Sequence, residues 1–130
     1  MAATVEQPKP PSIREVMEHA RAGKLRGRRC LGCSRVTFLD ELRCAVCHRQ
    51  EFAAFESKGE GEVVAFTIIA VPAEAFAAHG PYAFAVVRMA EGASTNGWLP
   101  SVRDARGLKI GDKVRVIPAP AGLGIAFEKV

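Results

Sequence analysis

The four cysteines of the chain are the residues best suited to chemistry, because they form two C-x-x-C pairs. Cys30 and Cys33 make the first pair, and Cys44 and Cys47 make the second after ten intervening residues. Two such pairs fold four thiolates around one ion, which is the arrangement of a closed tetrahedral zinc site. Four protein ligands leave no open position for water, so we expect a structural zinc. The site also uses every thiol of the chain, which leaves no cysteine as a nucleophile.

Two other uses of the cysteines stay open at this point. Rubredoxin-type iron binds the same set of four thiolates, and four cysteines also allow two disulfides. Paired C-x-x-C motifs without an N-terminal secretory signal favour a metal in a reducing compartment, so we expect a cytoplasmic protein. The longest apolar run, Val63 to Val71, is too short to span a bilayer. His48 follows Cys47 directly, but we expect it to be a bystander because thiolates already fill the site.

The formal charge of +4 comes entirely from the first part of the chain. Residues 1–58 carry 11 basic and 7 acidic side chains, whereas residues 59–130 carry 7 of each. Arg26, Arg28 and Arg29 stand just before the first cysteine pair. Cations at this place predict contact with an anion, either nucleic acid or a phosphate such as that of coenzyme A. The alternative is a solvated face that keeps the protein soluble.

The elements that position the cysteines begin with a short helix. Residues 1–11 contain three prolines and predict a flexible N-terminus. Ser12 and Glu15 form a capping box and Gly23 is a helix stop, so we expect a helical segment over 12–24. Its apolar stripe consists of Ile13, Val16, Met17 and Ala20. This stripe packs either on its own chain or on a partner protein.

The segment 25–58 is expected to form a zinc ribbon around the cysteine pairs. The run from Val36 to Leu39 predicts a strand between the two pairs. Ser34 and His48 stand where a zinc knuckle usually has glycine, and we expect these residues to adopt the tight turns instead.

The segment 59–130 shows short apolar runs separated by loops rich in glycine and proline. The predicted strands are Val63–Val71, Tyr82–Met89, Asn96–Leu99, Val114–Ile117 and Ile125–Phe127. Five short strands with one longer connection are typical of an OB-fold barrel, although an SH3-like barrel has a similar pattern. The sequence therefore predicts a mainly β chain: an N-terminal helix, a rubredoxin-like zinc ribbon and a five-stranded OB-fold domain.

Two of the predicted strands are apolar on both of their faces. Val63–Val71 and Tyr82–Met89 are interrupted chiefly by Thr67 and Arg88. A barrel strand that faces water on its outer side normally alternates apolar and polar residues. We therefore expect the N-terminal module, a ligand or another protein to cover these outer faces.

The sequence contains no recognisable catalytic motif. It has neither a P-loop nor a G-x-G-x-x-G motif. His19, His48 and His79 have no catalytic companion at a recognisable spacing. An enzyme that acts on its own is therefore not expected.

The order of several motifs along the chain is more informative than any single motif. A capped helix ends in Gly-Lys-Leu, and the two C-x-x-C pairs follow it. Gly-x-Gly-Glu-Val-Val-x-x-Thr then occupies 59–67, and Gly-Pro-Tyr at 80–82, Glu91-Gly92 and Ile110-Gly111 come later. From Ser12 onward the chain resembles the acyl-CoA-associated zinc-ribbon/OB-fold proteins, which long carried a domain-of-unknown-function label. It departs from them in lacking the knuckle glycines and a proline inside the second cysteine pair.

The resemblance implies a noncatalytic accessory subunit that forms a hetero-oligomer with a thiolase-fold enzyme. Such enzymes include thiolases, hydroxymethylglutaryl-CoA synthase assemblies and steroid side-chain lyases. It also implies a coenzyme A ester accommodated jointly with the partner, and docking through the two-faced strands and the stripe of Ile13, Val16 and Met17. Arg26, Arg28 and Arg29 are then candidates for contact with coenzyme A or the partner.

A nucleic-acid-binding OB-fold protein is the chief alternative. It predicts basic and aromatic side chains interleaved on the barrel strands. Residues 59–130 have no net positive charge, and their few aromatic residues lie largely inside apolar runs. These features disfavour nucleic acid as the ligand. A rubredoxin-like electron carrier is the third hypothesis, and an iron–thiolate colour would reveal it.

Overall fold

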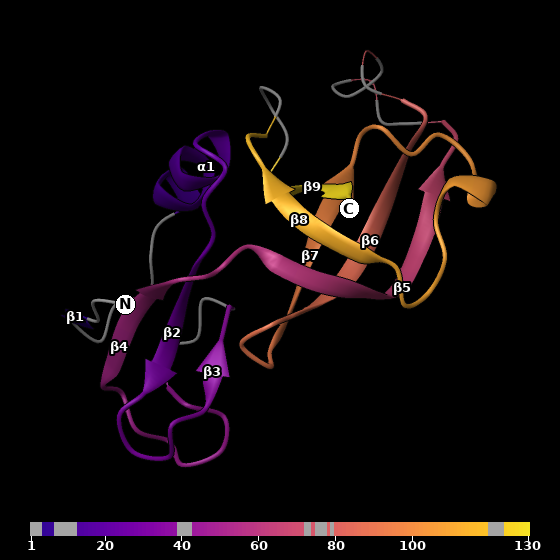
Figure 1. Cartoon of the computed structure of the whole chain (residues 1–130). Helices are drawn as coiled ribbons and strands as arrows, with labels where there is room; N and C mark the ends of the chain where they lie inside the picture. The colour runs from indigo at the N-terminus through magenta and orange to yellow at the C-terminus, as the bar shows by residue number, and fades with distance from the viewer. Residues whose placement is uncertain are drawn as a thin grey trace.

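The computed structural model describes residues 4–6, 13–38, 43–71, 74, 78, 80–119 and 124–130 (Figure 1). The elements are β1 (Thr4–Glu6), α1 (Ile13–Arg21), β2 (Arg26–Cys30), β3 (Val36–Thr37), β4 (Phe52–Glu56), β5 (Glu60–Ile69), β6 (Tyr82–Met89), β7 (Ser94–Leu99), η2 (Ala105–Gly107), β8 (Lys113–Ile117) and β9 (Ala126–Lys129). Within these ranges no helix has the length and apolar character needed to cross a membrane. Ser12, Leu39 and His79, which the sequence analysis singles out, lie outside the described residues.

The N-terminal sheet has four antiparallel strands in the order β1-β4-β2-β3. The sequence predicts a disordered or extended N-terminus over 1–11, and within it Thr4–Glu6 form the short strand β1. Val5 lies opposite Ala53 of β4. The edge of β4 presents backbone N–H and C=O groups, which a further strand satisfies. Because the partner lies almost fifty residues away, the local sequence carries little sign of this strand.

The second unit is a closed five-stranded barrel in the order β5-β6-β7-β9-β8. All neighbouring pairs are antiparallel except β7 and β9, which pair in parallel where Trp98 lies opposite Ala126. The barrel follows the sheet in the chain and lies beside it (Figure 1). This arrangement confirms the predicted fold class: a mainly β chain with an N-terminal helix, a cysteine-bearing sheet and an OB-like barrel. β5 ends at Ile69, two residues before the predicted end of its strand.

A bulge in β5 explains part of the two-faced pattern of that strand. The register against β6 shifts between Val63 and Ala65. Val63 is buried in the barrel core, and Phe66 and Ile68 pack against the same core. An ideal strand would place Val63 and Phe66 on opposite faces, because successive side chains alternate. The extra residue lets both contact the core, so apolar residues at odd and even positions here do not all require an external cover.

The barrel core is built from small and branched side chains around one large aromatic ring. Phe127 is fully buried, and Gly97 of β7 lies directly against it. A Cβ at Gly97 would lie 2.2 Å from Phe127 Cε2, so only glycine leaves room for the ring. The buried members of this core are Leu25, Val63, Ala83, Ala85, Val87, Met89, Leu99, Val102, Leu108, Val114 and Phe127.

The helix α1 ends as the sequence predicts and lies against the barrel. Gly23 has a φ of +74°, and the N–H of Lys24 donates to the carbonyl of His19. Many helices end with this combination of a left-handed glycine and a hydrogen bond back to a carbonyl of the last turn. The N–H of Ala119, just after β8, donates to the carbonyl of Ala20 at 2.8 Å. The C-terminal end of α1 is therefore attached to the barrel of its own chain (Figure 1).

Glu91 ties the barrel to the segment that joins it to the sheet. Its carboxylate, at the β6–β7 turn, accepts a hydrogen bond from Ser57 Oγ and another from the N–H of Lys58, both at 2.9 Å. The N–H of Ser57 also donates to the carbonyl of Leu25. These bonds converge on the residues between β4 and β5, so they hold the two units in one relative orientation.

We expect Glu91→Ala to lower the free energy of unfolding by about 1–2 kcal/mol, because two hydrogen bonds to a carboxylate are lost. Thermal unfolding of the metal-loaded protein measures this effect. Glu18→Ala on the exposed face of α1 is the matched control and is expected to change the midpoint little. An unchanged midpoint in Glu91→Ala would show that the carboxylate does not hold this junction.

Candidate metal centre and docking face

The two C-x-x-C pairs form two knuckles with the same backbone pattern. In the first knuckle, the N–H of Cys30 donates to the carbonyl of Arg35, and the N–H of Ser34 donates to the carbonyl of Cys30. In the second, Cys44 bonds to Arg49 and His48 bonds to Cys44 in the same way. The equivalent geometry brings two thiols from each knuckle to one point.

Ser34 and His48 adopt the knuckle turns without glycine. Both residues have a φ of +65°, in the left-handed region where glycine is usual. The sequence predicts tight turns at these two residues, and the backbone has them. The His48 side chain is exposed, and the group of candidate metal ligands in the described residues consists of the four cysteines alone.

The four sulfur atoms fit a tetrahedral metal site. All of them lie within 4.8 Å of one another. Cys30 Sγ lies 3.4 Å from Cys47 Sγ, and Cys33 Sγ lies 3.5 Å from Cys44 Sγ. Zinc–sulfur bonds of about 2.3 Å place tetrahedral sulfurs roughly 3.8 Å apart. The donor set and the spacing therefore suit zinc, with Cys30 and Cys44 buried and the other two exposed.

Backbone amides favour the thiolate form at the two buried cysteines. Hydrogen bonds from the backbone of Cys47 and Val46 lower the pKa of Cys44 to about 6. Burial raises the pKa of Cys30, but backbone hydrogen bonds from Cys33 and Gly32 outweigh burial and lower it. Metal binding requires deprotonated thiols. The pKa of Cys33, by contrast, is raised to about 11, because the backbone hydrogen bond from Arg35, which lowers it, is outweighed by side-chain hydrogen bonds, chiefly that with Cys44. The fold thus prepares one ligand on each knuckle, Cys30 and Cys44.

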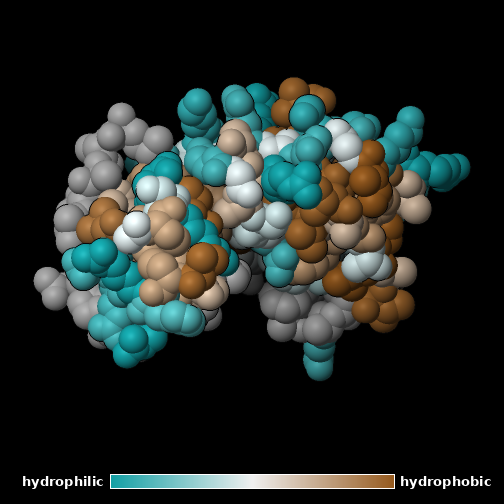
Figure 2. Space-filling view, turned by 90° about the horizontal axis from the view of Figure 1, so that it is seen from below, coloured by the Kyte–Doolittle hydropathy of each residue, from teal (hydrophilic) through white to brown (hydrophobic). Residues whose placement is uncertain are grey.

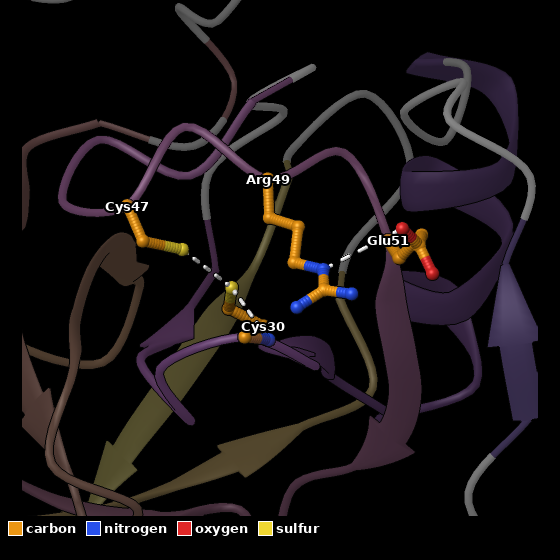
Figure 3. A network of polar contacts seen from close by, with 5 residues as sticks. Cys30, Cys47, Arg49 and Glu51 are labelled. Atoms are coloured by element: carbon orange, nitrogen blue, oxygen red, sulfur yellow. Dashed lines mark hydrogen bonds and ion pairs between the residues drawn. The ribbon is translucent and has the colours of Figure 1, made fainter.

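The Arg49 side chain packs beside the cluster, against the first knuckle (Figure 3). A Cβ on Gly32 would lie 2.8 Å from Arg49 Cδ and 3.1 Å from Cys47 Sγ, so a larger residue inside the first pair would displace the Arg49 side chain and crowd the Cys47 sulfur. Figure 3 shows Cys30 and Cys47 facing each other, with Arg49 beside them and directed toward Glu51. Arg49 Nε lies 3.5 Å from Glu51 Oε1. Both side chains are more than half exposed, so this ion pair adds little stability.

The three arginines before the first pair do not form one surface patch. Arg26 and Arg29 are exposed, but Arg28 is only 3% exposed and its guanidinium lies 4.2 Å from the centre of the Phe52 ring. Alternation along β2 places Arg28 and Arg29 on opposite faces of the sheet. Arg28 therefore supports the ribbon core, and contact with a surface ligand is left to Arg26 and Arg29.

The apolar stripe of α1 packs partly on its own chain. Ala20 is buried, and Val16 and Met17 are half-buried. A Cβ on Gly124 would lie 4.0 Å from Met17 Sδ, so Met17 is close to the barrel. The side chain of Ile13 lies outside the described part of the structure. The structure thus favours intramolecular packing for Met17 and Ala20.

The outer side of the barrel carries an aromatic and aliphatic surface. Tyr82 and Phe84 of β6 contact Trp98 of β7 edge to face, with ring centres 4.6 Å and 5.1 Å apart. Phe84, Val86 and Trp98 are all half-buried. The register places further residues beside them on neighbouring strands. We define the outer face as Ala65, Thr67, Phe84, Val86, Asn96 and Trp98.

The outer face is partly anticipated by the sequence. The two-faced pattern of Tyr82–Met89 predicts apolar residues on both sides of β6, and the structure has them. The sequence does not predict that Trp98 contributes to the outer face, because the predicted strand around this residue is short and isolated. In Figure 2 hydrophobic residues gather at the end of the molecule where β5 and β6 lie.

The comparisons with known proteins agree with this architecture. A family profile described as "ChsH2, C-terminal OB-fold domain" matches residues 55–117. A DUF35 domain-containing scaffold protein of Methanothermobacter thermautotrophicus is 29% identical over 94 residues, which cover 72% of this chain and 70% of that protein. A scaffold protein of the same description from Methanocaldococcus jannaschii is 32% identical over 72 residues, or 55% of this chain and 51% of the relative.

Two solved structures share the fold across both units. A chain of the Ltp2-ChsH2(DUF35) aldolase matches with a TM-score of 0.72 and 24% identity, covering 92% of this chain and 98% of that chain. A DUF35 protein of unknown function from Sulfolobus solfataricus matches with a TM-score of 0.63 and 17% identity, covering 90% and 84%. The family resemblance stated from the motifs is confirmed: residues 55–117 match the ChsH2 C-terminal OB-fold domain, and 72% of the chain is similar to a DUF35 domain-containing scaffold protein.

Proposed function

We propose that the chain is a noncatalytic scaffold subunit of a thiolase-type acyl-CoA enzyme complex in a reducing compartment such as the cytoplasm. The observation that carries the proposal is the similarity over 94 residues to a protein described as a DUF35 scaffold. The name of the Ltp2-ChsH2(DUF35) aldolase couples a DUF35 chain to a second protein, Ltp2. The motif resemblance supplies the class of the partner, a thiolase-fold subunit.

The clustering of all the thiols at one site supports a scaffold role. All four cysteines of the chain converge on one cluster, where zinc would cross-link the two knuckles. A metal with four protein ligands serves structure and does not activate water. A thiolase-type reaction needs a reactive thiol, so the partner has to supply it.

The outer face supports a protein partner over a nucleic acid. OB-folds bind oligonucleotides on the face of their second and third strands, and here Phe84 and Trp98 occupy that face. Base stacking on such rings is accompanied by cations along the phosphates. The nearby Arg88 lies 3.8 Å from Glu62, which also pairs with Lys113. An apolar surface bordered by such paired charges suits a protein interface better.

Accommodation of acyl-CoA is the finer part of the proposal. Arg26 and Arg29 remain exposed on the ribbon and are the candidates for contact with coenzyme A phosphates or with acidic partner residues. Arg28 is excluded from this role by its burial. The ester would bind jointly to this chain and its partner.

The isolated chain is expected to neither cleave nor condense acyl-CoA thioesters, because its only thiols are metal ligands. Assays of the purified, zinc-loaded chain for free coenzyme A release measure this directly. The same assays with a thiolase-fold partner are the positive control, and the mixture is expected to elute as one complex in size-exclusion chromatography. Turnover by the chain alone would overturn the scaffold assignment.

A further inference from the structure

We propose that the four-cysteine cluster is an oxidation site for hydrogen peroxide, at which zinc is replaced by two disulfides that join one knuckle to the other. The cluster belongs to the ribbon and not to the barrel that carries the outer face. The ribbon would exchange one cross-link for another and keep its fold. The proposal is independent of the scaffold function, because it concerns the thiols of this chain alone.

Each knuckle contributes one exposed and one buried cysteine. Cys33 and Cys47 are exposed, whereas Cys30 and Cys44 are both only 1% exposed. A peroxide molecule from solvent therefore reaches the second cysteine of each pair first. The thiolate is the form of cysteine that peroxide oxidises, and metal ligation keeps the cysteines in that form.

Each exposed sulfur contacts the buried sulfur of the opposite knuckle. Cys47 Sγ lies 3.4 Å from Cys30 Sγ, and Cys33 Sγ lies 3.5 Å from Cys44 Sγ. Figure 3 shows the first of these contacts, with the two side chains directed toward each other. Sulfur atoms this close are in van der Waals contact, so a short movement of the side chains brings them to the S–S bond length of about 2.05 Å. The buried cysteine is thus placed to react with an oxidised exposed cysteine.

The reaction takes two steps at each such pair of sulfurs. The exposed thiolate attacks one oxygen of hydrogen peroxide, the O–O bond breaks and hydroxide leaves, which gives a sulfenic acid. The buried thiolate then attacks that sulfur, the S–S bond forms and a second hydroxide leaves. Two electrons pass from sulfur to oxygen for each disulfide formed. The zinc ion loses its thiolate ligands and passes into solvent.

The pairing of the cysteines decides whether the oxidised ribbon stays folded. Disulfides that join residues 17 and 11 positions apart connect the two knuckles, as the metal does, and constrain the unfolded chain more than a bond within a C-x-x-C pair. Bonds within the pairs would leave the knuckles unconnected. The small ribbon core of Cys30, Cys44 and Phe52 gives the ribbon little else to hold it together.

Peptide mapping after peroxide treatment tests this pairing. The full zinc-loaded chain is treated with hydrogen peroxide, zinc release is followed with a chromogenic chelator, and the remaining thiols are alkylated. Trypsin cleaves after arginine and, once the chain is denatured, places the two cysteine pairs on separate peptides, 30–35 and 44–49. We expect release of about one zinc ion per chain and a single mass in which the two peptides are joined. Partial reduction with stepwise alkylation is expected to assign Cys30 to Cys47 and Cys33 to Cys44.

The chelated chain, oxidised in denaturant, is the matched control. Its pairing depends on separation in the sequence, so the short C-x-x-C loops close first and the two peptides stay separate. Hydrogen–deuterium exchange of the oxidised native chain is expected to show protection at 30–35 and 44–49 that the chelated, reduced chain lacks. Separate peptides from the native chain, sulfinic acids without disulfides, or zinc and thiols that survive peroxide would each overturn the proposal. So would an oxidised ribbon as unprotected as the chelated one.

Discussion

Chelation of the metal is expected to unfold the cysteine knuckles while the barrel stays folded. The ribbon has a small core of its own: Cys30, Cys44 and Phe52 form its buried cluster. A sheet with so little apolar burial depends on a metal cross-link, and structural zinc contributes about 10–16 kcal/mol of apparent binding free energy in zinc-finger peptides. The barrel has a separate and larger core. The loss of stability should therefore be confined to the first unit.

Hydrogen–deuterium exchange before and after chelation measures this difference. Amides of 30–35 and 44–49 are expected to lose protection, whereas those of β5 and β6 keep it. Cys44→Ser should behave like the chelated protein, and re-addition of zinc to the unaltered chain is the control that restores protection. Metal analysis that finds neither zinc nor iron, or mass spectrometry that finds two native disulfides, would contradict the metal centre.

A charge placed in the outer face is expected to abolish assembly with the partner enzyme. Val86 lies on β6 between Ala65 and Asn96 of the neighbouring strands, at the centre of the apolar surface. Val86→Asp would bury an unpaired carboxylate in the interface, and we expect at least a 100-fold loss in affinity, or about 3 kcal/mol. Isothermal titration calorimetry with the thiolase-fold subunit measures the affinity.

Ile110→Asp is the matched control for this substitution. Ile110 is 66% exposed and lies in the turn before β8, outside the outer face. It is expected to leave the affinity unchanged. The complex is also expected to persist at moderately high salt, because apolar burial is not screened. Equal affinities of the Val86→Asp variant and the unaltered chain would exclude the outer face as the docking surface.

The sequence predicts the order of elements and the cysteine set because these depend on local signals. The C-x-x-C spacing predicts four thiols at one point, and Gly23 predicts the end of α1. The positive φ of Ser34 and His48 follows from the tight turn that each knuckle requires. Patterns within about ten residues of one another were therefore sufficient for this part of the structure.

The remaining features depend on contacts between distant segments. β1 forms because it pairs with β4, from which it is separated in the sequence by the helix α1. Nothing in the proline-rich segment around β1 predicts this strand. The bulge in β5 reverses the alternation of inward and outward side chains that a regular strand has. Arg28 looks like a surface cation in the sequence, yet stacking on Phe52 keeps it in the ribbon core. Each of these outcomes is determined by a neighbour far away in the chain.

The central claim, that this chain is a scaffold for a thiolase-type enzyme, is tested most directly by capture of the tagged chain from its native host at moderately high salt. Quantitative mass spectrometry of the eluate measures which proteins are bound and in what ratio. The account predicts a thiolase-fold protein in a fixed ratio close to stoichiometric, and its loss from the eluate with Val86→Asp. Recovery of the chain alone, or with single-stranded nucleic acid and no thiolase-fold protein, would contradict it.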